Sequence, residues 1–148
     1  MSLKNDGVDA EEHFRTDCFP PGSHPFIHTL VDTKRAGRLV QAQPSDKIVT
    51  YDGRTWYAEV KSTENPTVFL FARMLRIGQK GSANLVIYNR GDYWVHVRHE
   101  LTKTWYHIPY QFLRDYPRQS IRWEHLDKFP QLKRLPYTWS PEEWAFTF

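Results

Sequence analysis

The sequence has one cysteine and no long run of apolar residues. Cys18 cannot form a disulfide within the chain, which agrees with a reducing compartment. Every apolar stretch falls short of the roughly 18 consecutive residues that a membrane-spanning helix needs, and the first residues lack the apolar stretch of a signal peptide. These absences exclude an intrachain disulfide scaffold and predict a cytoplasmic protein with no membrane segment.

Internal repeats, low-complexity tracts and recognisable linkers are also missing, so nothing in the composition divides the chain. The 148 residues are 40% hydrophobic and 16% aromatic, which is enough for one compact core and hardly for two. We therefore expect a single domain over residues 1–148 with one functional site.

The excess of positive charge is small. Twenty Lys and Arg residues stand against seventeen Asp and Glu residues, and the net charge of +3 permits nucleic-acid binding without requiring it. Acidic residues are dense between residues 6 and 12, whereas basic residues recur at 34–38, 73–80 and 128–134. This distribution predicts a basic rim around an acidic spot, and the first basic segment contributes Lys34, Arg35 and Arg38.

The strongest local pattern is a predicted β-hairpin. Residues 47–51 and 55–61 are rich in β-branched and aromatic side chains, and they flank Asp52-Gly53, a strong signal for a two-residue turn. If these two residues are the centre of the turn, Tyr51 pairs with Arg54. The same register then places Asp46 directly opposite Glu59.

Opposed carboxylates on one sheet face need a compensating charge. Directly opposed residues bring their Cβ atoms to about 5 Å, where two like charges destabilise a sheet. A divalent cation between Asp46 and Glu59 would provide the compensation, and Lys61 projects from the same face because it lies two residues beyond Glu59. Two acids, a metal and a lysine fit metal-assisted phosphodiester hydrolysis, in which the metal lowers the pKa of a bound water. The lysine can orient or deprotonate that water, or stabilise the developing charge.

The alternative is a surface hairpin without a site. An isolated Glu-x-Lys sequence is common among solvated charges, so this motif alone has little specificity. The neighbouring segments decide between the two interpretations.

The segment after Lys61 predicts a helix and then a strand. Residues 67–80 carry an apolar stripe at helical spacing, and Asn65-Pro66 is typical of a helix start. On this helix Gln79 would end the inward-facing stripe, and an apolar strand would follow over 84–88. Another face of the helix, either solvated or directed to DNA, would carry Arg73, Arg76 and Lys80.

The remaining segments predict further elements of a mixed α/β domain. A first helix should run from Asn5 or Asp6 to about Thr16. We also expect an extended segment near 29–32, strands over 93–98 and 104–108, and a short helix over 109–116. Residues 120–148 are aromatic and basic without a clear period. Packing of this tail onto its own domain or onto a second subunit is favoured over direct stacking on bases.

The order of these pieces resembles the PD-(D/E)xK nucleases, most closely the RecU-type and Hjc-type Holliday-junction resolvases. The pieces are a first helix with an acid, then Pro44-Ser45-Asp46, then Glu59-Val60-Lys61-Ser62-Thr63, then a helix with Gln79. The segment from Lys4 to Glu11 is similar to the Lys/Gly/Glu pattern that opens the Hjc type. The likeness covers about residues 4–90 and also fits small phage and bacterial nucleases that trim, nick or degrade DNA.

The resemblance implies a fold of the α/β (α+β) class with a restriction-endonuclease-like core. In that core a central mixed β-sheet is flanked by helices in the order αβββαβ. C-terminal strands and an aromatic tail would be added to this order. The core would span about residues 4–108, and a C-terminal extension would cover about 109–148. The implied activity is that of a Mg²⁺-dependent deoxyribonuclease, with Mn²⁺ able to substitute. Double-stranded or branched DNA in a bacterial or phage-infected cell would be its substrate.

The resemblance also assigns roles to individual residues. Asp46 and Glu59 would be metal ligands, together with the Val60 carbonyl, and Lys61 would be the catalytic lysine. Glu11, with Glu12 as the alternate, would be the acid of the first helix, and Gln79 would help to position the site. Because a junction resolvase makes two symmetric cuts, we predict a homodimer.

Other kinds of site receive less support from the sequence. The spacing of His13, Cys18, His24 and His28 matches no standard zinc finger, and Pro25 interrupts the histidine pair, so we expect no zinc site. A nucleophilic Cys18 would need a positioned base that the sequence does not show. A non-catalytic DNA-binding or assembly module, or a structural phage-type protein, remains the alternative to the enzyme.

Overall fold

A five-stranded mixed sheet organises the protein in the computed structural model, which describes residues 6–30, 45–75 and 77–135. The strands are β1 (Phe26–Thr29), β2 (Lys47–Tyr51), β3 (Arg54–Thr63), β5 (Tyr93–His99) and β6 (Thr104–Pro109). Their order across the sheet is β1-β2-β3-β5-β6. β5 runs parallel to β3, and the other neighbouring pairs are antiparallel. The predicted mixed α/β class with a central sheet is confirmed.

The predicted hairpin between β2 and β3 is confirmed in its register. Tyr51 pairs with Arg54, and the ladder continues to Lys47 opposite Ala58. Asp52 and Gly53 have φ angles of 50° and 78°. Positive φ at both central residues is the requirement of a type I′ turn, whose twist matches that of the flanking strands. The turn therefore fixes which β2 residues lie opposite which β3 residues.

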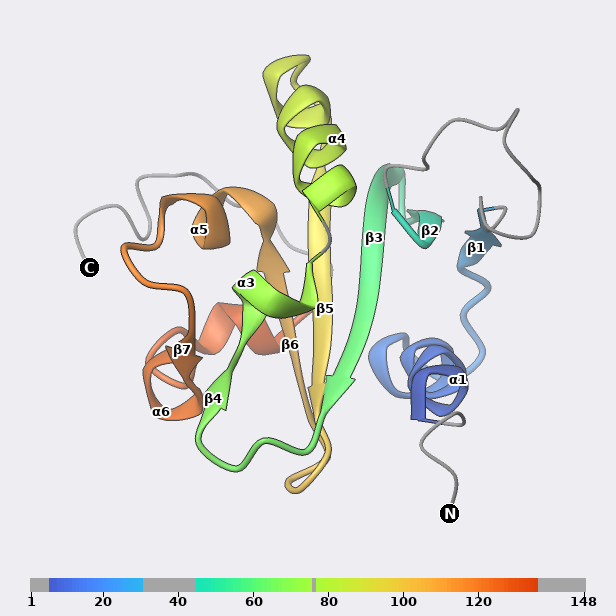
Figure 1. Cartoon of the computed structure of the whole chain (residues 1–148). Coiled ribbons are helices and arrows are strands. Elements are labelled where there is room, and N and C mark those ends of the chain that lie inside the picture. Colours follow the sequence, from blue (N-terminus) through green and yellow to red (C-terminus); the bar gives the residue numbers. More distant parts are fainter. Residues whose placement is uncertain (1–5, 31–44, 76, 136–148) are drawn as a thin grey trace.

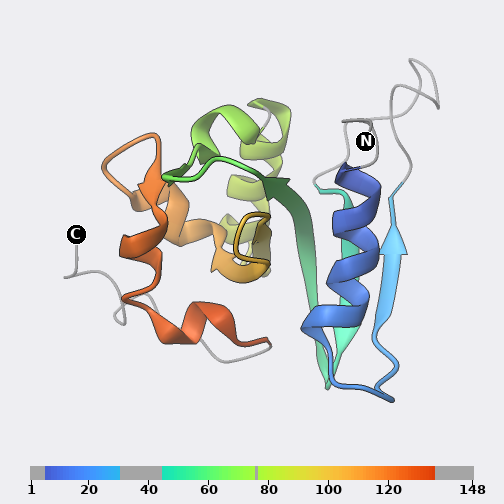
Figure 2. The same cartoon turned by 90° about the horizontal axis from the view of Figure 1, so that it is seen from below.

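Helices cover both faces of the sheet. Helix α1 (Asp6–Cys18) lies on one face, and Figures 1 and 2 show it beside β1, β2 and β3. Its buried side chains Ala10 and Phe14 pack against residues that point to this face, among them Val49, Ala58 and Trp94. The opposite face is covered by the segments that follow β3 and β6, so β5 is buried on both sides.

The structure contradicts the prediction of a single helix over 67–80 and a strand over 84–88. Residues Val68–Phe69 instead form the short strand β4, followed by α3 (Phe71–Met74) and α4 (Ile77–Tyr88). Leu75 ends α3 in an extended conformation, with φ −92° and ψ 120°. Short apolar runs fit a strand or a helix equally well, and here pairing with another strand outweighs the helical spacing.

Asn65 acts in a turn and does not cap a helix. Its Oδ1 atom accepts hydrogen bonds from the backbone N–H groups of Thr67 and Val68, each at 3.0 Å. An asparagine side chain that bonds to backbone two or three residues ahead stabilises a turn of the chain. This turn directs Val68 and Phe69 into antiparallel pairing with Arg122 and Ile121 of β7 (Ile121–Arg122).

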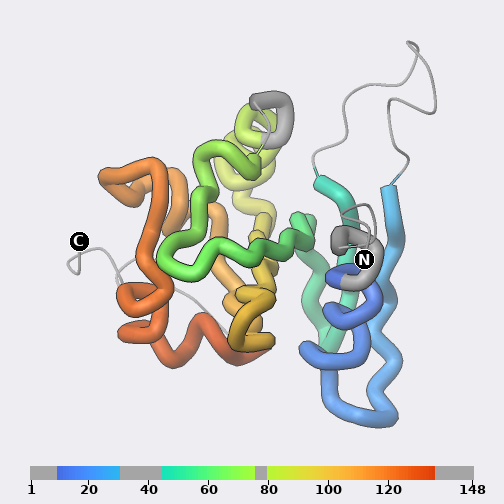
Figure 3. Tube along the Cα trace, turned by 60° about the horizontal axis from the view of Figure 1, so that its bottom comes forward, coloured from blue at the N-terminus to red at the C-terminus, as the bar shows by residue number. Residues whose placement is uncertain are grey.

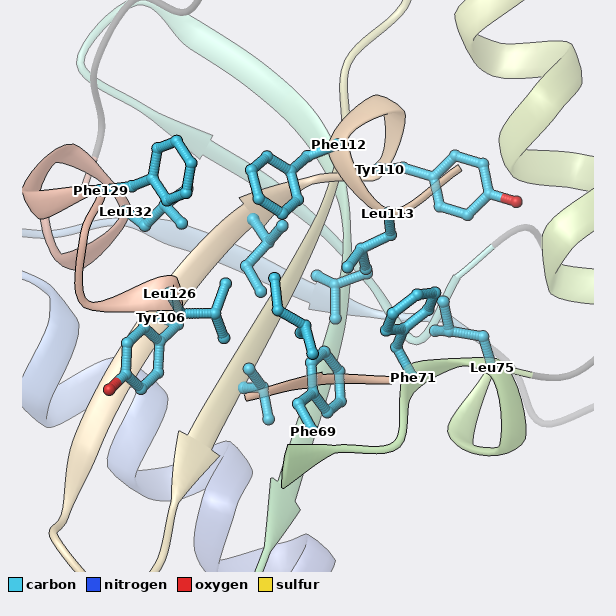
Figure 4. Packing of buried hydrophobic residues seen from close by; sticks show 14 of the residues in the cluster. Phe69, Phe71, Leu75, Tyr106, Tyr110, Phe112, Leu113, Leu126, Phe129 and Leu132 are labelled. Atoms are coloured by element: carbon cyan, nitrogen blue, oxygen red, sulfur yellow. The ribbon is translucent and has the colours of Figure 1, made fainter. Parts of the chain in front are cut away.

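The C-terminal elements belong to the same core. α5 (Tyr110–Asp115) follows β6 directly, close to the predicted short helix, and β7, α6 (Trp123–Leu126) and a 3₁₀ helix at Pro130–Lys133 come after it. Figure 3 shows the stretch after β3 running across to these elements. Figure 4 shows their side chains in one apolar cluster with β4 and α3 residues: Phe69, Phe71, Phe112, Leu126, Phe129 and Leu132. The described part of the tail therefore packs onto its own domain.

Replacing Leu126 with alanine tests whether the C-terminal elements share the core. Leu126 is fully buried, so Leu126→Ala should lower the free energy of unfolding by about 2–5 kcal/mol through lost apolar contacts and a residual cavity. Leu85 on α4 is 64% exposed, and Leu85→Ala should change stability by less than about 0.5 kcal/mol. Urea denaturation followed by tryptophan fluorescence measures both variants. Equal, small effects would mean that the C-terminal elements are separable from the sheet.

Candidate functional site

The structure brings Asp46 and Glu59 together as the hairpin register predicts. Asp46 immediately precedes β2, at the position that continues the ladder opposite Glu59. The carboxyl group of Glu59 is hydrogen-bonded to both the side chain and the backbone of Asp46. Glu59 is completely buried, whereas Asp46 is half-buried. The pair thus consists of one carboxyl group that is shielded from water and one that is partly accessible to it.

Lys61 lies beside this pair on the same sheet face. Its Nζ atom is 3.4 Å from Oε2 of Glu59, and its side chain is 20% exposed. Alternation along β3 explains the placement, because residues 59 and 61 point to the same side. An ammonium group at the solvent-accessible edge of two carboxyl groups can contact a bound phosphate and the carboxyl groups together.

The Val60 carbonyl is directed to the same edge. Residues that flank a two-residue hairpin turn form a hydrogen-bonded pair, and such pairs recur at every second residue of the ladder. Counting from the Tyr51–Arg54 pair, Val60 directs its backbone groups toward β2, one step beyond the last ladder pair at Ala58. Its carbonyl therefore faces the chain at Ser45 and Asp46, where it can join the two carboxylates as an oxygen ligand.

Burial and proximity alter the acidity of Glu59. Its burial, and next the negative charge of Asp46, raise the pKa of Glu59 from 4.5 to about 8, although Lys61 acts in the opposite direction. Desolvation disfavours the charged form of a carboxyl group, and a neighbouring carboxylate does the same. Without a cation, the pair therefore retains a proton near neutral pH.

Tyr93 lies near the Asp46–Glu59 pair, and the sequence analysis did not predict this position. It is almost fully buried, and its ring packs edge-on against Tyr110 with centroids 5.6 Å apart. Burial, followed by the charges of Glu59 and Asp46, raises the pKa of the Tyr93 hydroxyl. Parallel pairing of β3 with β5 produces this proximity, and a local sequence pattern contains no signal for such a pairing.

The acids of the first helix lie on the other side of the sheet. Glu11 Oε1 is 3.1 Å from Nζ of Lys47, which also donates a hydrogen bond to Thr29 at 2.9 Å. Lys47 points to the α1 face and its neighbour Asp46 to the opposite one, because successive strand residues alternate. Glu12 is exposed on α1. In this structure Glu11 is thus the partner of a buried lysine.

The other predicted residues are arranged differently from the sequence-based expectation. Gln79 lies in α4, but its side chain is outside the described residues, and Arg76 lies outside the described residues altogether. Arg73 is exposed on α3, and Lys80 on α4 donates a hydrogen bond to the Ala72 carbonyl at 3.0 Å. Arg73 and Lys80 do not share one helix face, because the chain is extended at Leu75 between the two helices. The basic segment with Lys34, Arg35 and Arg38 lies outside the described residues.

Histidines form a buried pair that the sequence also did not reveal. His96 Nδ1 lies 2.9 Å from His107 Nδ1, and Trp56 donates a hydrogen bond to His96 Nε2 at 3.0 Å. Burial lowers the pKa of both histidines, and that of His107 falls to about 3. They are neutral near pH 7 and connect β3, β5 and β6 under α1. Elsewhere, His13 lies 3.7 Å from Asp17 on α1.

The donor set at Asp46, Glu59 and Val60 fits a hard divalent cation. Two carboxylates and a carbonyl are the oxygen ligands that Mg²⁺ takes, with water completing its coordination. A cation here would replace the proton that the buried pair otherwise holds. Among the residues that the structure describes, no group of three or more His, Cys, Asp or Glu side chains is arranged to hold a metal. The candidate site has two such side chains and depends on the backbone carbonyl for a third protein ligand.

The sequence matches no protein-family model and no curated protein. Within the described ranges, no helix is long and apolar enough to cross a membrane.

The raised pKa of Glu59 predicts a pH-dependent stability in the metal-free protein. A carboxyl group that binds its proton more tightly when folded stabilises the fold below its unfolded pKa, and this contribution is lost as pH rises through the folded value. As pH rises from about 4.5 to about 8, wild type should lose on the order of 2–4 kcal/mol relative to Glu59→Gln. Urea denaturation in EDTA across this pH range measures the free energy of unfolding of both proteins. The histidine contributions cancel in the difference, because both proteins share them.

A matched control is Glu124→Gln, because Glu124 is exposed on α6. This variant should follow the wild-type pH dependence. Parallel stability curves for wild type and Glu59→Gln would contradict a proton held between Asp46 and Glu59.

Proposed function

We propose that this protein is a metal-dependent DNA endonuclease with a restriction-endonuclease-like core, and that Asp46, Glu59 and Lys61 form its catalytic centre. The observation that carries the proposal is the meeting of two opposed carboxyl groups and a lysine on one sheet face. A purely structural hairpin gains nothing from placing two acids in contact, because like charges directly opposite destabilise a sheet.

The order of the elements supports the proposed core. A helix precedes three antiparallel strands, helical segments follow, and the next strand joins β3 in parallel. The sequence resemblance to PD-(D/E)xK nucleases led us to expect a helix, three strands, a helix and a strand. The additional pieces are β4 and α3, inserted before α4, and the C-terminal elements after β6.

The proposed mechanism divides the work among the three residues. Asp46, Glu59 and the Val60 carbonyl would hold Mg²⁺ or Mn²⁺. A metal bound there neutralises phosphate charge and lowers the pKa of a coordinated water. Lys61, within 3.4 Å of Glu59, contacts the attacking water or a non-bridging phosphate oxygen and stabilises the charge that develops during attack. Because Glu59 is buried, substrate approaches from the side of Asp46 and Lys61.

DNA is the proposed substrate because the chain carries a small net positive charge and has cations on the side of the sheet where the candidate site lies. The net charge is +3, and Arg73 and Lys80 lie on the α3 and α4 segments that cover the same side of the sheet. Lysine and arginine contacts to phosphates supply most of the sequence-independent affinity for DNA. Double-stranded or branched DNA, cut by a homodimer in the cytoplasm, remains the prediction from the family resemblance.

Cleavage assays test this function. We expect Mg²⁺-dependent cutting of labelled four-way junction, nicked, linear or single-stranded DNA. Glu59→Gln and Lys61→Ala should each reduce the rate at least about 100-fold, the size of effect expected when a positioned group in proton transfer or charge stabilisation is lost. Glu124→Gln should cut at the wild-type rate, and thermal unfolding checks that each variant is folded.

The substrate that is cut refines the proposal. Symmetric cuts in the junction, absent in both site variants, would assign a resolvase activity, whereas cuts confined to the other DNAs would keep the nuclease and reject the junction role. If a folded wild type cuts none of them with Mg²⁺ or Mn²⁺, the enzyme proposal fails and a non-catalytic DNA-binding module replaces it.

A further inference from the structure

A cavity lies on the side of the sheet that carries the candidate catalytic centre. This cavity has a volume of about 300 Å³ and is formed by α3, α5, the residues after α5 and Lys80 of α4. Pockets that hold small organic ligands begin at about this size. Its floor is apolar and aromatic, with Phe71, Leu75, Tyr110, Leu113 and Tyr116.

The aromatic rings of this cavity are fixed by packing. Phe71 and Tyr116 meet edge to face with centroids 6.1 Å apart, and the Tyr116 hydroxyl lies 2.9 Å from His125 Nδ1. Figure 4 shows Tyr110 at the edge of the core cluster, near Phe71, Leu75 and Leu113, with its hydroxyl directed away from the other labelled side chains. Tyr110 is only 5% exposed, so Tyr116, which is half-buried, is the tyrosine with ring surface left for a ligand, and its fixed ring binds at little cost in conformational entropy.

The rim of the cavity is positively charged. Among the described residues, Lys80, Arg114 and Arg118 line the cavity and no acidic residue does. Arg114 is close enough to Tyr110, and Arg118 to Tyr116, for each cation to lower the pKa of its tyrosine against the effect of burial. Asp115, the next residue in the chain, forms an ion pair with Arg114, with Oδ1 3.0 Å from Arg114 Nε. An aromatic floor under a cationic rim is complementary to a flat ring that carries a phosphate.

Tyr110 connects this cavity to the catalytic face. Its ring contacts Tyr93, and Tyr93 lies within the electric field of Glu59 and Asp46. A ligand in the cavity would therefore be separated from the carboxyl pair by these two tyrosines. Both tyrosines are buried, so a bound strand would reach from the cavity to the carboxyl pair over the surface and not past these rings.

We propose that this cavity binds an unpaired nucleotide of the DNA substrate, with its base on Tyr116 and its phosphate on Arg114 and Arg118. The inference rests on the proposed function for the identity of the substrate. It adds that the protein holds a single-stranded end, flap or junction arm beside the cut. Aromatic side chains and cations together are the general means by which proteins hold unpaired strands.

Binding measured without cleavage tests the proposal. Fluorescence anisotropy in EDTA would compare a short oligothymidylate, an abasic strand of the same length, a blunt duplex and free dTMP. Wild type should bind the oligothymidylate at least about fivefold more tightly than the abasic strand, because base stacking is lost in the latter. The double variant Arg114→Gln/Arg118→Gln should weaken oligothymidylate binding and reduce the dependence of log affinity on log salt by about 1.

The matched control is Lys103→Gln, which also removes an exposed cation. Lys103 is 65% exposed in the turn between β5 and β6, away from the residues of the cavity. It should leave binding and its salt dependence close to wild type. Equal losses in both proteins, or equal affinity for the abasic strand, would overturn the proposal. Equal affinity of dTMP and oligothymidylate would overturn the role in holding a strand.

The outcome of this binding experiment can be distinguished from that of the cleavage assays. Specific binding through Arg114 and Arg118 by a wild type that cuts no DNA would keep the nucleotide cavity and reject the enzyme. Cutting that is lost in Glu59→Gln, with unchanged binding in the double arginine variant, would keep the enzyme and reject the cavity.

Discussion

The contact between the Asp46 and Glu59 carboxyl groups is the constraint around which the rest of the structure is arranged. A buried carboxyl group beside a second one is costly unless a proton or a cation compensates it. The hairpin register sets the two acids opposite each other, and the alternation of β3 adds Lys61 on the same face. Burial of Glu59 raises its pKa. The stability of the pair therefore depends on a bound proton or cation. A divalent cation bound between the two carboxyl groups would supply this compensation.

The two apolar clusters hold this arrangement in place from opposite sides. Under α1, side chains such as Phe14, Val49 and Ala58 support the hairpin from behind. On the face that carries Asp46, Glu59 and Lys61, β4 and the C-terminal elements close over β5 and β6, and the segments around them also form the cavity. The aromatic tail that follows β6 is thus explained, as far as residue 135, by its contribution to the core and to the cavity.

The hairpin and its carboxyl pair were predictable because their information is local. Asp52-Gly53 specifies the turn, and counting outward from Tyr51 and Arg54 gives the opposition of Asp46 and Glu59. The segment after Asn65 was predicted wrongly because its apolar residues fit two periods, and pairing with the distant Ile121 selected a strand. Tyr93 and the histidine pair depend on the pairing of β5 with β3 and β6, which no short pattern encodes.

Calorimetric titration of the metal-free protein with Mn²⁺ tests the central claim most directly. The account predicts one site in wild type and in Glu124→Gln, and no binding at that site in Asp46→Asn or Glu59→Gln, provided that the circular dichroism spectra show all four proteins folded. Both substitutions keep the size of the side chain and remove its negative charge. Binding that is unchanged in the two site variants, or absent from wild type, would contradict the assignment of the carboxyl pair as a metal site.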